Sequence, residues 1–190
     1  TAGSARTDSL GKYKVFALAA GDYRLRFNAC SGSSSNVAPE FYDDKSTLGE
    51  STTVPVATDS DTTGVDAQLA PGGSISGTVS GGDTGYSDPS GLGFICRISV
   101  DAYDSNGDLA GSDSFFAYSG DYSIRSLATG NYRLKFTYWC GNPSPVGGNH
   151  PPGKELSEFY DDESTLAAAI PVSVTAGSDT PNIDAEVNPR

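Results

Sequence analysis

An internal repeat with an incomplete first copy constrains this chain more than any other feature. Residues 11–27 (GKYKVFALAAGDYRLRF) recur as residues 120–136 (GDYSIRSLATGNYRLKF), and residues 40–48 (EFYDDKSTL) recur as residues 158–166 (EFYDDESTL). Residues 72–119, which precede the second copy, have no counterpart before the first copy. The sequence therefore predicts the C-terminal part of one module followed by one complete module.

The repeat predicts two domains of unequal completeness. Residues 72–190 are long enough to bury a core, whereas residues 1–71 form the C-terminal part of a repeat that is marginal by itself. The missing front strands would leave sheet edges and an apolar face uncovered. Either upstream residues were removed, or another chain covers the gap by strand addition. The junction at 67–73 (AQLAPGG) has almost no linker, which predicts a stiff connection.

The amino-acid composition limits which cellular compartment and which classes of binding partner we expect. The 190 residues carry a net charge of −12, with a pI near 4.2 and no basic patch, which argues against nucleic acid and against anionic membranes. No apolar run is long enough for a membrane span. The chain starts at Thr1 without a signal peptide, as expected of a mature or trimmed secreted product. We therefore expect a secreted or cell-surface protein.

Short alternating segments separated by turn residues predict β-strands throughout. In the second copy we expect strands at 74–80, 94–104, 109–118, 122–127, 131–139, 170–174 and 182–187, with a hairpin turn at Asn106-Gly107. In the first copy we expect only the later strands, at 13–18, 22–27, 53–56 and 64–69. Strands of this length and spacing are typical of a Greek-key β-sandwich, so we predict an all-β fold of tandem sandwich modules.

The three cysteines indicate an oxidising compartment. Cys96 and Cys140 both fall on the inward faces of predicted strands, which favours a disulfide that would stabilise the fold by about 4 kcal/mol. The alternative is two free buried thiols. Cys30 is the counterpart of Cys140, and the strand that would hold its partner is missing. We therefore expect Cys30 to be unpaired or to form an intermolecular bond.

The pattern GxYxxxxLxxGxYRLxF, then FYDDxST, then IDAxLxPGGSISGTV resembles the carboxypeptidase-regulatory-like, or transthyretin-like, repeats of secreted bacterial proteins. These are similar to the B-type repeats of Gram-positive surface adhesins. The resemblance covers nearly the whole chain, and its most specific parts are Gly120–Tyr122 and Pro71–Val79. It implies Ig-like or prealbumin-like sandwiches that act as extracellular structural or adhesive modules. Many adhesin repeats carry a Lys–Asn crosslink, but residues 74–80 (SISGTVS) contain no Lys, so the disulfide would serve as the staple.

Groups that could support catalysis or bind a metal are few. His150, the only histidine, lies in a Pro/Gly-rich loop with no counterpart in the first copy. The acidic residues around FYDD occur in both copies, and duplication favours a structural turn over catalysis or calcium binding; they are Glu40, Asp43, Asp44, Glu158, Asp161 and Asp162. A third group alternates oxygen ligands like a calcium loop but lacks the glycine and glutamate of an EF-hand, so a hairpin is favoured; it comprises Asp104, Asn106 and Asp108. We predict no cofactor and no enzymatic activity.

Aromatic residues give the strongest indication of ligand binding. Trp139, the only tryptophan, alternates away from the core face and precedes a proline-rich insertion. It is a candidate for stacking on a sugar ring, together with Tyr138, Phe115 and Phe116. The alternative is that Trp139 packs under its own loop.

We predict a non-catalytic extracellular module that serves as a spacer, a stalk or a self-assembling fibre unit. Its partners would be neighbouring modules or identical chains, whose strands could complete the first copy. The alternative is a carbohydrate-binding module of a secreted glycoside hydrolase, with polysaccharide as the partner. A hydrolase in its own right is disfavoured because the sequence offers no catalytic set.

Overall fold

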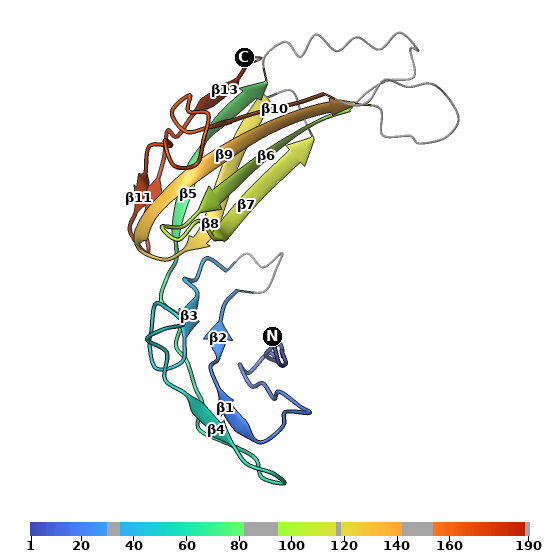
Figure 1. Ribbon diagram of the computed structural model, residues 1–190, viewed down its shortest axis with the longest axis vertical. Coiled ribbons are helices and arrows are strands. Elements are labelled where there is room, and N and C mark those ends of the chain that lie inside the picture. Colours follow the sequence, from blue (N-terminus) through green and yellow to red (C-terminus); the bar gives the residue numbers. More distant parts are fainter. Residues whose placement is uncertain (30–34, 82–94, 117–118, 142–153, 189–190) are drawn as a thin grey trace, which may run out of the picture. The chain divides into compact units, whose positions relative to one another are not determined.

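The computed structural model is all-β in its described residues, which confirms the all-β part of the predicted fold class (Figure 1). It describes residues 1–29, 35–81, 95–116, 119–141 and 154–188. The chain divides into two compact units, Thr1–Pro71 (unit 1) and Gly72–Arg190 (unit 2). Each unit is described separately below.

The described residues of unit 2 form two sheets. The first has the strand order β10-β9-β6-β7, with β11 also paired to β9. In the second, β8 lies antiparallel to β5, while β12 and β13 lie parallel to it. The strands are β5 (Gly73–Gly81), β6 (Ile95–Tyr103), β7 (Leu109–Phe116), β8 (Ser119–Leu127), β9 (Gly130–Gly141), β10 (Lys154–Phe159), β11 (Val172–Val174), β12 (Asp179–Thr180) and β13 (Ala185–Val187).

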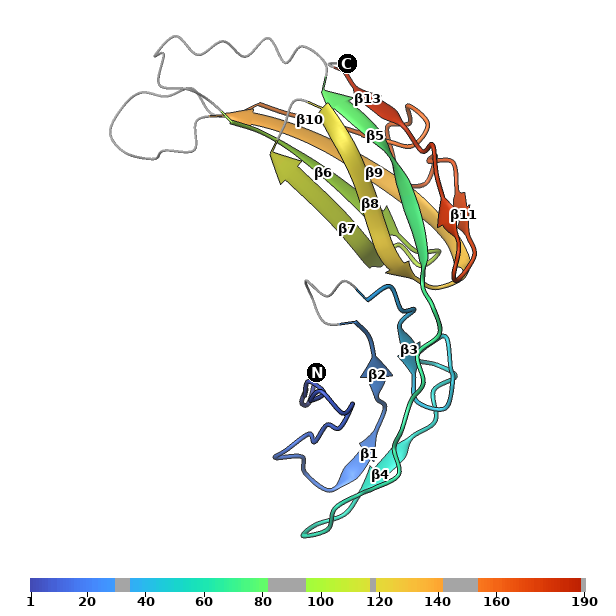
Figure 2. The same cartoon turned by 180° about the vertical axis from the view of Figure 1, so that it is seen from behind.

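The two sheets of unit 2 share one apolar core and form a sandwich-like arrangement (Figures 1 and 2). Alternate residues of each long strand point inward, as the period-2 pattern predicted. The most deeply buried side chains come from both sheets: Ile75, Val79, Ile98, Val100, Ile124, Leu127, Leu134, Phe136 and Val187. Tyr122 of β8 meets Phe136 of β9 edge to face, with ring centroids 5.9 Å apart.

Unit 1 repeats the strand pairing of unit 2 on a smaller scale. Its strands are β1 (Gly21–Tyr23), β2 (Arg26–Phe27), β3 (Glu40–Phe41) and β4 (Val54–Val56). Residues that are equivalent in the repeat pair in the same register in both units. The matching pairs are Gly21–Val56 and Gly130–Val174, Tyr23–Val54 and Tyr132–Val172, Arg26–Phe41 and Lys135–Phe159, and Phe27–Glu40 and Phe136–Glu158.

Side-chain contacts repeat as well. Tyr23 donates a 2.8 Å hydrogen bond to the carbonyl of Ala19, as Tyr132 does to Ala128 at 2.9 Å. The ring pair equivalent to Tyr122–Phe136 is Tyr13–Phe27, at 5.7 Å. The repeat is therefore one of three-dimensional contacts as well as of sequence.

Two strand predictions for unit 1 were wrong. Residues 13–18 and 64–69 form no strand, although their unit 2 equivalents lie in β8 and around β13. In unit 2 both of those strands pair with β5. Unit 1 has no equivalent of β5 among its described residues, so these segments lack the partner that would make them strands.

The start of the chain also differs from expectation. In unit 1, residues 1–4 (TAGS) occupy the position that the first residues of β7, 109–112 (LAGS), occupy in unit 2. A Cβ atom placed on Gly3 would lie 2.8 Å from Val15 Cγ1 and 3.3 Å from Leu18 Cδ2. One placed on Gly111 would lie 2.8 Å from Ile124 Cγ2 and 3.4 Å from Leu127 Cδ2, the equivalent atoms. The part of unit 2 without a counterpart is therefore shorter than residues 72–119, and its described strands are β5 and β6.

Candidate functional site

A row of four side chains crosses the outer face of the five-stranded sheet of unit 2. Phe116 on β7 pairs with Arg97 on β6, Arg97 pairs with Trp139 on β9, and Trp139 pairs with Glu155 on β10. Cys96, Ile98, Tyr138 and Cys140, the chain neighbours of Arg97 and Trp139, are all buried, so Arg97 and Trp139 face away from the core.

These residues line a shallow hollow of about 380 Å³, together with Ser99 and Thr137 of the next row. Phe116 is 70% exposed, and Trp139 is partly exposed. The strands of Phe116 and Trp139 lie about 10 Å apart, because neighbouring strands are spaced by about 4.8 Å. Arg97 lies between the two and donates a 3.1 Å hydrogen bond to Ser114 Oγ. The hollow thus offers two aromatic faces, one guanidinium and one carboxylate.

The charged residues continue along the same face. Asp101 of β6 pairs with Lys135 of β9, two rows from Trp139. Burial raises the pKa of Asp101, and the positive charges of Lys135 and Arg97 oppose that rise.

Two of the predicted stacking residues are placed elsewhere. Tyr138 is only 2% exposed and packs in the core, so its assignment as a stacking residue was wrong. Its ring lies against Gly81 of β5, where any side chain would collide with it. Phe115 is partly buried against the core and close to Gly120, so it too faces away from the hollow. Only Trp139 and Phe116 share the outer face.

Sequence reasoning missed Arg97 and Glu155. The alternation of Arg97 between Cys96 and Ile98 indicates an outward side chain, but it does not reveal which strands lie beside β6. The row appears only once the pairing of β7, β6, β9 and β10 is known.

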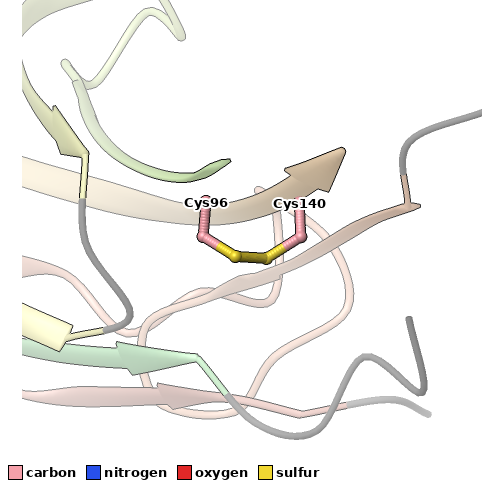
Figure 3. Close-up of a disulfide and its surroundings, with 2 residues drawn as sticks. All are labelled: Cys96 and Cys140. Carbon is pink, nitrogen blue, oxygen red and sulfur yellow. A yellow bond between two sulfur atoms is a disulfide. The ribbon is translucent and has the colours of Figure 1, made fainter. Parts of the chain in front are cut away.

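The predicted disulfide between Cys96 and Cys140 is confirmed (Figure 3). It joins directly paired residues on the neighbouring strands β6 and β9, with Cα atoms 4.1 Å apart. Both cysteines lie on the core face, at 5% and 1% exposure. The bond therefore ties two strands of one sheet at the end of the sandwich where β6 begins and β9 ends.

The segment that resembled a calcium loop forms the hairpin turn between β6 and β7. The Asp104 carboxylate accepts hydrogen bonds from the backbone N–H groups of Asn106 and Asp108, at 2.8 and 3.0 Å. Gly107, with a φ of +83°, has the left-handed conformation that such a turn favours. Asp8 caps a turn in the same way, accepting from the N–H groups of Leu10 and Lys12.

The acidic FYDD segments form tight turns in both units. Phe41 and Lys45 exchange backbone hydrogen bonds of 2.8 and 3.1 Å, and Phe159 and Glu163 do the same at 2.8 and 2.9 Å. In unit 1, Thr52 donates a 2.8 Å hydrogen bond to Asp43. In unit 2 a hollow of about 200 Å³ is lined by carboxylates of this turn and of the C-terminal strand, namely Glu158, Asp161, Asp162, Asp184 and Glu186. Among the described residues, no group of His, Cys, Asp and Glu is arranged to hold a metal ion.

Cys30 and His150 lie outside the residues that the structure describes. The predictions made for them therefore rest on the sequence. Comparison with known proteins adds no identification: no family model, no curated protein and no solved structure matches this chain.

Proposed function

We propose that this chain is a non-catalytic structural or adhesive module of a secreted or cell-surface protein, serving as a spacer, a stalk or a fibre unit. The observation that carries the proposal is the parallel pairing of the first and last strands of unit 2. Ala185 pairs with Val79 and Val187 with Gly81, while Asp179 pairs with Ser74 near the start of β5. The chain therefore enters unit 2 at one end of β5 and leaves it at the other.

This geometry suits a module that carries tension. The two ends of β5 are separated by about 26 Å, because a strand rises about 3.3 Å per residue. Pulling the entry and exit points apart would shear β5 against β12 and β13, loading all of their hydrogen bonds together. Further bonds act in the same direction: Asp184 accepts from the N–H and the hydroxyl of Thr78, at 2.7 and 2.9 Å, and Ile183 donates to the Ser76 carbonyl at 3.1 Å.

We further propose that the modules are Ig-like or prealbumin-like Greek-key sandwiches of the carboxypeptidase-regulatory-like type, with unit 1 incomplete. In support, β7 and β8 follow each other in the chain but belong to different sheets, as do β5 and β6. Secretion is supported by the core disulfide, which requires an oxidising compartment to persist. Within the described residues there is no helix long and apolar enough to cross a lipid bilayer.

Single-molecule force spectroscopy tests the structural role. The full chain, held at its two termini, is expected to show a distinct unfolding event for unit 2. Reduction should lengthen that event by about 150 Å, because the 44-residue separation of the bonded cysteines is then released. Asp184→Ala should lower the unfolding force, and Asp121→Ala, an exposed change on β8, should not. Unfolding of oxidised unit 2 without a measurable force barrier would contradict the proposal.

The hollow at Trp139 favours a second candidate, a carbohydrate-binding module such as those appended to secreted glycoside hydrolases. Two aromatic side chains, with an arginine between them and a glutamate beside the tryptophan, fit sugar rings, which stack their apolar faces and hydrogen-bond through their hydroxyls. A pull-down with insoluble polysaccharides is the test. Retention that Trp139→Ala abolishes, but that Leu109→Ala at the far end of β7 leaves intact, would favour this function over a pure spacer.

A further inference from the structure

The side chains of the hollow at Trp139 follow a fixed order across the strands. From β7 to β10 they are Phe116, Arg97, Trp139 and Glu155. Each aromatic ring is therefore followed by a charged group. This aromatic row extends over about 14 Å, because it crosses three strand spacings of about 4.8 Å. A ligand that contacts all four side chains must lie across the strands and not along them.

A second row, made only of hydroxyl side chains, runs beside the aromatic row. Its members come from the same four strands, pair directly with one another and are Ser114, Ser99, Thr137 and Ser157. The two rows lie about 7 Å apart, since they are two residues apart along each strand. The 3.1 Å hydrogen bond from Arg97 to Ser114 Oγ links them. Hydroxyl groups both donate and accept hydrogen bonds, as the hydroxyls of a sugar do.

The charges in and beside the hollow balance, although the chain as a whole carries −12. Arg97 and Glu155 have opposite charges within the aromatic row, and Lys135 pairs with Asp101 farther along the same face. A polyanion would gain one guanidinium but would meet the negative field of the rest of the chain, which disfavours it. An uncharged ligand avoids that repulsion and still finds a donor in Arg97 and an acceptor in Glu155.

A protein partner suits this face less well than a saccharide does. Trp, Phe and Arg are enriched in protein interfaces, but Ser and Glu are depleted there, and Ser and Thr rarely contribute much binding energy. Here Ser99 and Thr137 form part of the hollow itself. Aromatic rings beside a row of hydroxyls match a ligand that has both apolar ring faces and many hydroxyl groups.

We propose that this face of unit 2 binds an uncharged, linear polysaccharide that lies across β7, β6, β9 and β10, with about one sugar unit over each strand. The first and third units stack on Phe116 and Trp139, because a pyranose ring is about as wide as one strand spacing and cannot reach both. Arg97 donates to an oxygen of the unit between them, and Glu155 accepts from a hydroxyl of the fourth unit. This inference rests on the carbohydrate-binding role proposed above and specifies its ligand.

The test uses the intrinsic fluorescence of Trp139, which reports on this site alone because the chain has one tryptophan. The full chain is titrated with the neutral tetrasaccharides of glucose, xylose, mannose and N-acetylglucosamine, each β-linked, and with the matching disaccharides. At least one tetrasaccharide is expected to bind about fivefold or more tightly than its own disaccharide, because only the longer chain reaches the second aromatic ring. Tetragalacturonate, an anionic chain of the same length, should bind more weakly than that neutral tetrasaccharide.

The variant Phe116→Ala separates binding across the strands from simple stacking on Trp139. It should weaken tetrasaccharide binding about twofold to tenfold, the range of one aromatic contact. It should leave disaccharide binding at Trp139 unchanged, because a disaccharide there does not reach β7. Arg97→Lys keeps the charge but loses the planar fork of donors, so it should also weaken tetrasaccharide binding. Leu109→Ala, at a 58% exposed position at the start of β7, is the matched control and should change neither affinity.

Three results would overturn the inference while carbohydrate binding itself stands. These are equal affinities for tetrasaccharide and disaccharide, an equal effect of Phe116→Ala on both, and tighter binding of tetragalacturonate than of every neutral tetrasaccharide. If no saccharide changes the fluorescence of Trp139, the inference fails as well. If the polysaccharide pull-down then shows no retention either, the carbohydrate-binding candidate fails with it. The force measurement on unit 2 tests the structural role independently of all these results.

Discussion

The hydroxyl of Tyr122 donates a 2.7 Å hydrogen bond to the backbone carbonyl of Ile183, and Tyr13 makes the equivalent 2.6 Å bond to Val65. In unit 2 the bond connects β8 to the segment just before β13, and in unit 1 it connects the equivalent two segments. Burial raises the pKa of both tyrosines, with nearby Asp184 and Asp66 adding to the rise. The two units thus share this contact but differ in how fully it is shielded from water.

Tyr122→Phe is expected to lower the free energy of unfolding of unit 2 by about 1–2 kcal/mol, because it removes a buried donor and leaves the Ile183 carbonyl short of a partner. Tyr13→Phe should cost less, since Tyr13 is half-buried while Tyr122 is 2% exposed. Urea unfolding followed by circular dichroism measures both. An equal loss in the two variants would show that burial does not govern the strength of this bond.

Removing the disulfide by Cys96→Ala and Cys140→Ala should destabilise unit 2 by about 4 kcal/mol, from the entropy of a loop of this length in the unfolded chain. The relevant separation is 44 residues. Urea unfolding of the double variant, compared with the oxidised parent, gives the difference. The parent in reductant serves as the control, and its stability should match that of the variant apart from the effect of the two thiol groups that the variant lacks.

Cys30 should remain without a partner inside the chain, because Cys96 and Cys140 bond to each other and the sequence holds three cysteines. Intact mass under non-reducing conditions should show either one alkylatable thiol per chain or a disulfide-linked dimer that reductant resolves. Cys30→Ser should abolish both signals. A persistent dimer in that variant would mean that the core bond exchanges between chains.

The hydrogen bonds between Asp184 and Thr78 should make the stability of unit 2 fall at acid pH. Two hydrogen bonds from Thr78 lower the pKa of Asp184, so the folded state favours the ionised form. Its contribution is fully present above the unfolded pKa of about 3.9 and is lost as the pH falls through the lower folded value. The urea midpoint of Asp184→Asn should therefore lie below that of the parent at pH 7 and converge with it near pH 2. Asp121→Asn, at an exposed position on β8, should show no such convergence.

Most long strands of unit 2 were predictable because their residues alternate cleanly, but β10 and β12 were not among the predicted strands. Ile98 and Val100 mark one face of β6, and Leu134 and Phe136 mark one face of β9. The same alternation placed Cys96 and Cys140 inward, which made their bond predictable. The hairpin at Gly107 followed from its Asn-Gly pair, whose preference is set within four residues.

The features that the sequence did not predict are those that depend on which strands lie side by side in the sheets. Tyr13 and Val15 alternate as Tyr122 and Ile124 do, yet only the latter pair lies in a strand, because only unit 2 supplies β5 beside it. The row from Phe116 to Glu155 likewise joins residues of four strands whose order no local pattern reveals. The match between TAGS at the start of the chain and LAGS in β7 was visible in the sequence, but four residues were too few to identify it.

Gly77 should tolerate no side chain. A Cβ atom there would lie against the carbonyl of Ile183, a backbone group that cannot rotate away, so β5 and the C-terminal segment would have to separate. Gly77→Ala is therefore expected to destabilise unit 2 by about 1–3 kcal/mol, as overpacking does elsewhere. Gly49→Ala is the matched control, since its nearest neighbour atom would be 4.0 Å away and only the unfolded chain should respond. Thermal unfolding by circular dichroism compares the two. A Gly77→Ala chain as stable as the Gly49→Ala chain would mean that β5 does not run as close to Ile183 as the structure has it.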